Sequence, residues 1–299
     1  DLAAVGPGVL NDWKVDLLAD VFARSAAHLQ GEETSSSENK LAAYREAVLI
    51  ALTPEERSDS WFERQVEVLP SSFLASSDVA DAVLTLRRFR ALKDLDADAW
   101  CVYSPETKTL EFTAGVSRGS GRGGFSSMAG ALSSAGLEIH SAGTDLLADG
   151  LLMLRYVVTD PTSPEGTTKQ RQEEVCRALT AAVDSDDPPK FPSVWGADQL
   201  EASIQLSALP NEVRIDTTLS DDFTIVEVFT FDRRGLLYRL ARKLHDLELV
   251  ISHAKIGTYL DQVVDTFYVV DHQGRKIYDQ GRLAEIRTAM LQVAEAGSS

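Results

Sequence analysis

The spacing of apolar residues predicts a helical first third of the chain, followed by segments in which strands alternate with helices. Up to about residue 95, apolar residues recur every three or four positions, as they do on one face of a helix. Thr53-Pro54-Glu55-Glu56 supplies an N-cap, a proline at the first helical position and the glutamate of a capping box, which predicts a helix from there to Leu69. Asp78 begins a further helix. The arginines on that helix are predicted to form a solvated or salt-bridged face: Arg87, Arg88 and Arg90.

Beyond residue 96 the chain repeats itself. Residues 99–159 align over residues 211–271 without a gap, and the identities fall where packing would require them. A match of this length predicts two copies of one fold. The identical pairs include Arg122 with Arg234, Gly123 with Gly235, Ala129 with Ala241, Leu132 with Leu244, Leu137 with Leu249, Ile139 with Ile251, Ala142 with Ala254, Asp149 with Asp261, and Tyr156 with Tyr268.

Each copy has the same predicted order of elements, which makes the fold class α+β. A short strand and a longer strand precede a helix, two further strands and a closing helix, as in a ferredoxin-like βαββαβ domain with both helices on one face. The short first strands, Trp100–Tyr103 and Val213–Asp216, are expected to lie antiparallel beside the strands that follow them. There they would fill the sheet edge that a terminal fourth strand usually fills.

The expected domain organisation has four parts. A helical region covers residues 1–95, and the first ferredoxin-like domain covers residues 96–184. Residues 185–209 form a linker, because their acidic and proline-rich start does not suit a helix or a strand. The second ferredoxin-like domain covers residues 210–299.

Composition narrows the possible partners. The 46 acidic and 29 basic residues give a net charge of −17, spread along the chain, so nucleic acid and anionic membranes are poor partners and a small molecule or a protein is favoured. The two cysteines, Cys101 and Cys176, form no disulfide framework, which fits a reducing cytoplasm. No apolar run reaches the length of a membrane span. Because the chain begins at Asp1 and not at a methionine, we expect it to be part of a longer protein.

Four segments of the second copy carry a family resemblance. Thr224–Val228, Asp232–Tyr238, Ile251–Ile256 and Val264–Asp271 resemble an ACT domain of the type found in the bacterial PII uridylyltransferase/uridylyl-removing enzymes. Upstream, further segments resemble the end of the HD domain of those enzymes and the helical stretch before their first ACT domain. These segments are Val5–Gly8, Asn11–Lys14, Leu17–Leu18, Leu69–Pro70 and Phe73–Leu74.

The resemblance implies a regulatory function. A region of this kind would bind an amino acid, glutamine, and would report nitrogen status to a parent enzyme that modifies the PII signalling protein. No cofactor is implied for this chain, and magnesium only for the parent enzyme. ACT sheets also tend to pair edge to edge or to pack helix against helix, within a chain or across a dimer, and both arrangements stay open.

The catalytic motifs of that family are absent from the sequence. A nucleotidyltransferase of this kind needs a Gly-Ser turn followed by an Asp-x-Asp pair that holds magnesium and the nucleotide, and the chain has neither. The only His-Asp dipeptide, His245-Asp246, falls late in a predicted helix and is more plausibly a polar helix end than part of a phosphohydrolase site. Enzyme activity therefore belongs, by resemblance, to a parent nucleotidyltransferase, and we expect no catalytic residue here.

The turn before the helix of the second copy is the candidate effector site. Backbone N–H groups of Gly235 and Leu236 at a helix start suit a carboxylate, since they lack partners within the helix and the helix dipole favours an anion. Asp232 suits an ammonium group, although a helix cap alone would also explain it. Arg233 and Arg234 lie in the same turn. On the following strand, His253 is a further candidate, with a solvent-facing position as the alternative.

The first copy offers a weaker version of this site. Ser120 stands where the second copy has Asp232, Gly123 is retained, and Glu138 on the next strand is a candidate substitute for the missing carboxylate. The same turn, Gly119 to Gly124, matches G-x-G-x-x-G, so the alternative function is a stand-alone nucleotide-binding protein. Against that alternative, the second copy has no glycine triplet at this place.

Overall fold

The structure, a computed structural model, describes most of the chain as two compact units, residues 1–91 and residues 92–299. Predictions that concern residues 1–32 lie outside the described residues. Among the described helices, none combines the length and the apolar character needed to cross a bilayer. The described residues are 33–70, 73, 78–92, 97–117, 124–163, 166–183, 185, 188–191, 210–231, 233–259 and 262–296.

The first unit is helical, as predicted, but one expected helix is divided in two. Its helices are α2 (Glu33–Ala51), α3 (Pro54–Ser58), α4 (Ser60–Glu67) and α6 (Val79–Ala91). The capping box is confirmed, since the Thr53 hydroxyl accepts from the Glu56 N–H at 3.2 Å and the Glu56 carboxylate accepts from the Thr53 N–H at 2.8 Å. The helix expected to run on to Leu69 breaks at Asp59, whose backbone is extended and whose carboxylate caps α4 by accepting from the Trp61 N–H at 3.0 Å.

Two of the three arginines of α6 form the predicted salt-bridged face. Arg87 Nε lies 2.6 Å from Glu56 Oε1, and Arg90 Nη2 lies 2.9 Å from Asp59 Oδ2. These ion pairs join α6 to the residues that cap α3 and α4.

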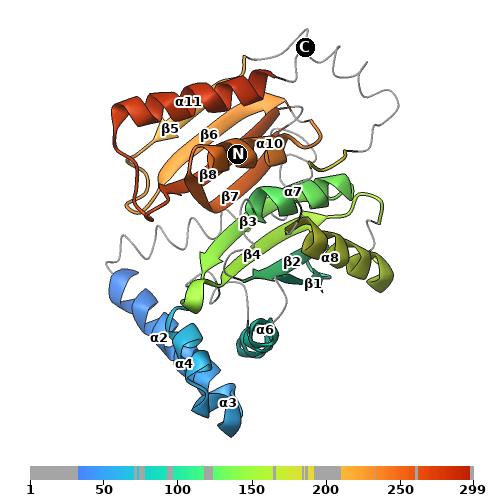
Figure 1. Cartoon of the computed structure of the whole chain (residues 1–299), viewed down its shortest axis with the longest axis vertical. Coiled ribbons are helices and arrows are strands. Elements are labelled where there is room, and N and C mark those ends of the chain that lie inside the picture. Colours follow the sequence, from blue (N-terminus) through green and yellow to red (C-terminus); the bar gives the residue numbers. More distant parts are fainter. Residues whose placement is uncertain are drawn as a thin grey trace, which may run out of the picture. The chain divides into compact units, whose positions relative to one another are not determined.

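In the part of the second unit that the structure describes, eight strands form one antiparallel sheet, accompanied by four α-helices and a short 3₁₀ helix (Figure 1). The first repeat contributes half of the strands and the second repeat the other half, in the spatial order β1-β2-β4-β3-β7-β8-β6-β5. The first repeat consists of β1 (Ala97–Ser104), β2 (Thr109–Val116), α7 (Gly124–Ser134), β3 (Glu138–Leu146), the short 3₁₀ helix η2 (Ala148–Gly150), β4 (Leu152–Thr159) and α8 (Lys169–Val183). The second consists of β5 (Glu212–Asp216), β6 (Thr224–Phe231), α10 (Leu236–Asp246), β7 (Leu249–Tyr259), β8 (Gln262–Asp271) and α11 (Gln280–Glu295).

The extra first strand of each repeat lies where the sequence predicts it. Antiparallel pairing places Trp100 of β1 opposite Thr113 of β2, and Val213 of β5 opposite Val228 of β6. Apolar side chains of all four helices and of both half-sheets form one core cluster. Among the repeat identities, Leu132 and Leu244 are completely buried. The ferredoxin-like architecture is therefore confirmed for both copies.

The two repeats join within the chain, through what we call the central pairing of β3 with β7. It consists of Ser141 opposite Lys255, Ala142 opposite Ala254 and Gly143 opposite His253. Ala142 and Ala254 are equivalent residues of the two repeats, so an approximate two-fold axis passes between them. Within one chain, the two repeats therefore associate edge to edge, which is one of the arrangements that the sequence left open.

In the last strand of each repeat, the structurally equivalent residues differ by one position from the pairs in the gapless sequence alignment. Tyr156 lies opposite Ala142, and the residue opposite Ala254 is Phe267, not Tyr268. Burial agrees, since Tyr156 and Phe267 are both completely buried whereas Tyr268 is half-buried. The hairpin between β7 and β8 is shorter than the one between β3 and β4, which accounts for the shift.

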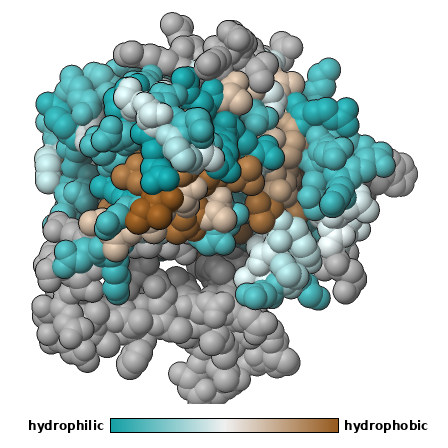
Figure 2. All heavy atoms as spheres, turned by 90° about the horizontal axis from the view of Figure 1, so that it is seen from below, coloured by the Kyte–Doolittle hydropathy of each residue, from teal (hydrophilic) through white to brown (hydrophobic). Residues whose placement is uncertain are grey.

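The coloured surface in Figure 2 is mostly hydrophilic, with apolar residues gathered in a smaller area. This distribution fits a chain with 46 acidic and 29 basic residues.

Candidate functional site

The predicted effector turn connects the end of β6 to the start of α10. Gly235 is the N-cap residue of α10, and its φ of +71° lies in the left-handed region that favours glycine. Only some of the other residues predicted for this site lie in the part of the chain that the structure describes. Asp232 lies outside the described residues, as do Gly123 and the rest of the first repeat's turn before Gly124.

The N–H groups of this turn are already partly engaged. The Leu236 N–H donates to the Arg233 carbonyl at 3.0 Å, and the Arg239 N–H donates to the Gly235 carbonyl at 3.0 Å. Leu236 itself is buried in the core. A ligand carboxylate that takes the Leu236 N–H would therefore replace a bond within the turn.

The two arginines of the turn have different surroundings. Arg233 Nη2 donates to the carbonyls of Val293 and Ala294 at 2.7 and 2.6 Å, at the C-terminal end of α11, where a cation suits the helix dipole. Arg234 is exposed, and its carbonyl accepts from Arg239 at 3.2 Å. Arg233 thus links the turn to α11.

Described residues of the linker cover the turn, which the sequence does not predict. A Cβ atom on Gly235 would lie 2.4 Å from the Phe191 ring, so the ring rests directly on this glycine. Phe191 also lies beside Tyr238 of α10, with 6.0 Å between ring centroids. Pro189 packs against Gly130 of α7, where an added Cβ would lie 2.7 Å from its ring. The only signal for this contact in the sequence is an aromatic residue within a proline-rich segment.

His253 is part of the central pairing, and its side chain faces away from the helices. Side chains alternate between the two faces of a strand, and the adjacent Ala254 lies in the helix-covered core. The His253 ring lies 5.7 Å from Phe223 and 6.2 Å from Tyr268, centroid to centroid. Desolvation lowers the His253 pKa, and the charge of Asp145 from the first repeat opposes this shift.

Glu138 also lies on the face away from the helices, since its neighbour Ile139 is buried in the core. It is exposed, and its carboxylate accepts from the Thr159 hydroxyl at 3.5 Å. The sheet therefore separates both His253 and Glu138 from the start of α10. The structure brings Arg233, Arg234, Gly235 and Leu236 together but does not bring these two side chains to them.

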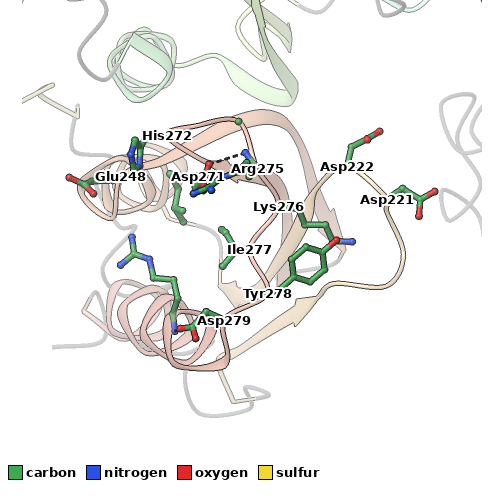
Figure 3. Close-up of a pocket in the computed structure, with 13 residues that line it drawn as sticks. Asp221, Asp222, Glu248, Asp271, His272, Arg275, Lys276, Ile277, Tyr278 and Asp279 are labelled. Carbon is green, nitrogen blue, oxygen red and sulfur yellow. Dashed lines mark hydrogen bonds and ion pairs between the residues drawn. The ribbon is translucent and has the colours of Figure 1, made fainter.

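A pocket of about 800 Å³ lies at the other end of the second repeat (Figure 3). It is lined by the residues just before β6, the turn between α10 and β7, the end of β8 and the connection to α11, whereas the effector turn follows the end of β6. Several of its charged groups make hydrogen bonds within these connections. Asp271 accepts from Arg275 Nε at 3.0 Å, Lys276 donates to the Ser220 carbonyl at 2.5 Å, and Asp279 caps α11.

Among the residues that the structure describes, no three His, Cys, Asp or Glu side chains gather closely enough to hold a metal ion.

Comparisons with known proteins find a family model that the second repeat matches and larger enzymes that align with nearly the whole chain. Residues 212–294 match the family of ACR9-like, ACT-like domains. The chain is 28% identical to the bifunctional uridylyltransferase/uridylyl-removing enzyme of Rhodospirillum rubrum over 97% of the chain. It is 31% identical to the enzyme of that name from Gluconobacter oxydans over 97% of the chain, and 30% identical to that from Caulobacter vibrioides over 99%. The chain spans 31% of the length of each of these relatives.

Proposed function

We propose that this chain is the regulatory, effector-binding region of a bifunctional uridylyltransferase/uridylyl-removing enzyme. One observation carries the proposal. Two ACT-like repeats share a single sheet in a chain that aligns over 97% of its length with about a third of such an enzyme. The helical first unit and the two repeats would then follow catalytic domains in the remaining two thirds of the parent protein.

The proposed effector is glutamine. It would report nitrogen status and shift the parent enzyme between uridylylating and de-uridylylating the PII signalling protein. Such a shift requires that glutamine bind one state of the enzyme more tightly than the other. The catalytic states belong to the parent protein, so this chain alone tests the binding and not the coupling.

We place the ligand at the β6–α10 turn. Its carboxylate would meet the N–H groups near Gly235, and its ammonium group would meet Asp232. Because the Phe191 ring rests on Gly235, the linker residue would either move aside or form one wall of the site.

Mutation of the proposed ammonium partner tests the location. A charge-assisted hydrogen bond contributes about 1.5–3 kcal/mol, so Asp232→Ala should weaken glutamine binding by about 10- to 150-fold in isothermal titration calorimetry. Ser120→Ala, at the aligned place in the first repeat, is the matched control and should change little. Circular dichroism must show an intact fold, because loss of a helix cap alone costs about 1 kcal/mol. An Asp232→Ala protein that binds glutamine as tightly as wild type would place the site elsewhere.

Equilibrium dialysis against ATP, UTP and NAD distinguishes the alternative function. Nucleotide binding that Gly121→Val abolishes, together with no binding of glutamine, would refute the regulatory proposal and favour a nucleotide site at Gly119–Gly124.

A further inference from the structure

A carboxylate that is not part of the proposed effector turn is buried inside the second repeat. Asp265 of β8 is only 1% exposed. It lies opposite Val228 of β6, which is buried in the helix-covered core, and opposite Ile256 of β7, which is partly buried and packs against that core. Burial of a carboxylate is costly unless polar groups receive it, so this residue is expected to have a specific role.

The first repeat has a leucine at the equivalent place. Thr144 lies opposite Leu154 in the first repeat, and its counterpart Ile256 lies opposite Asp265 in the second. Two residues further along the same strands, Tyr156 corresponds to Phe267. The first repeat thus has an apolar and then a polar side chain on this face, and the second repeat has the reverse order.

Contacts in the first repeat show where these positions lie. A Cβ atom on Gly124, the first residue of α7, would lie 3.2 Å from Leu154 Cδ1. The Tyr156 hydroxyl donates to the carbonyl of Phe125, the next residue of α7, at 2.6 Å. Since Gly124 corresponds to Leu236, the first residue of α10, and Leu154 to Asp265, we infer by analogy that the Asp265 side chain points towards the first turn of α10.

The chemistry of a helix start suits a carboxylate. The first N–H groups of a helix lack intrahelical acceptors, and the positive end of the helix dipole stabilises an anion. A tyrosine hydroxyl can donate to a carbonyl, as Tyr156 does, whereas an ionised carboxylate only accepts hydrogen bonds and therefore suits the N–H end of a helix.

We propose that Asp265 is a positioning residue, which fixes the first turn of α10 from inside the core in the geometry that receives the effector. The effector part of this inference rests on the proposed function. Since the first repeat has Leu154 at this place, the second repeat alone has this means of ordering its turn.

Exchange of the two side chains for those of the first repeat tests the role. The double variant Asp265→Leu/Phe267→Tyr reproduces a pair that the same fold already accommodates, so it should fold. Hydrogen exchange measured by mass spectrometry should be at least 10-fold faster for the amides of residues 236–240 and unchanged in α7. Glutamine affinity should fall at least 10-fold. Leu154→Met, at the equivalent place in the first repeat, is the control and should leave exchange in α10 and glutamine affinity unchanged.

A conservative variant keeps the proposal testable if the double variant does not fold. Asp265→Asn retains an acceptor oxygen and loses the charge, so it should show smaller changes in the same direction. Wild-type exchange in α10 in either folded variant would overturn the positioning role. If wild-type protein does not bind glutamine, the proposed function fails, and the exchange measurement still decides the role of Asp265.

Discussion

Gly235 combines two constraints that can be separated by mutation. Its φ of +71° disfavours any side chain, and a Cβ atom would lie 2.4 Å from the Phe191 ring. Gly274, in the turn after β8, has a similar φ of +77° but nothing within 4 Å of an added Cβ. The two glycines therefore differ mainly in the contact with Phe191.

We expect Gly274→Ala to lower the free energy of unfolding by about 1–2 kcal/mol, the usual cost of a left-handed residue. Gly235→Ala should lower it by a further 1–3 kcal/mol or so, because the new methyl group overpacks against the Phe191 ring. Denaturant titration measures both. The double variant Gly235→Ala/Phe191→Ala should return to the loss seen for Gly274→Ala. Equal losses for the two single variants would show that Phe191 does not rest on the turn in solution.

At the scale of elements, Glu56 links α3 to α6. Its carboxylate completes the capping box with Thr53 and accepts from Arg87 Nε at 2.6 Å. The Arg87 guanidinium, aided by the Thr53 N–H, lowers the pKa of this carboxyl from 4.5 to about 2.

A lowered pKa in the folded state means that the ionised carboxylate stabilises the fold above pH 4.5, and that this contribution is lost as the pH falls from 4.5 towards 2. A carboxyl titration by NMR should therefore give a midpoint near 2 for Glu56. In Arg87→Ala the midpoint should move up towards 4.5, although the capping hydrogen bonds should keep it below that value. A wild-type midpoint near 4.5 would contradict an ion pair between these helices.

Periodicity predicts most elements well, because each is specified by residues close in sequence. The strands, the helices that cover them and the extra strand at Val213–Asp216 follow from local patterns. The break at Asp59 in the helix predicted from the capping box to Leu69 does not, since the sequence alone does not distinguish an aspartate that caps the next helix from an exposed residue within a helix. The contact between Phe191 and Gly235 is also missed, because it depends on how the linker folds back over α10.

The site is predicted less completely than the fold. The turn at Gly235 begins α10 as expected, but His253 and Glu138 lie on the face away from the helices. Which face a strand residue occupies depends on register and on β-bulges, and bulges interrupt β3 and β7 beside Ser141 and His253. Asp265 lies within a segment that resembles an ACT domain, but its burial on the helix-covered face is known only from the structure.

For the whole molecule, the continuous sheet predicts cooperative unfolding of the two repeats. Their core residues form one cluster, and the central pairing joins their sheets edge to edge. Differential scanning calorimetry should show one transition for residues 97–296, with equal calorimetric and van't Hoff enthalpies for that transition. Separate transitions for the two repeats, resolved by hydrogen exchange in β3 and β7, would contradict this expectation.

Because the central pairing lies within one chain, the association of the two repeats does not depend on the protein concentration. Two ACT-like domains on separate chains would meet with an affinity that depends on protein concentration. Here the linker holds the second partner at an effective concentration on the order of millimolar, whatever the concentration of the protein itself. The pair therefore stays assembled however dilute the protein is.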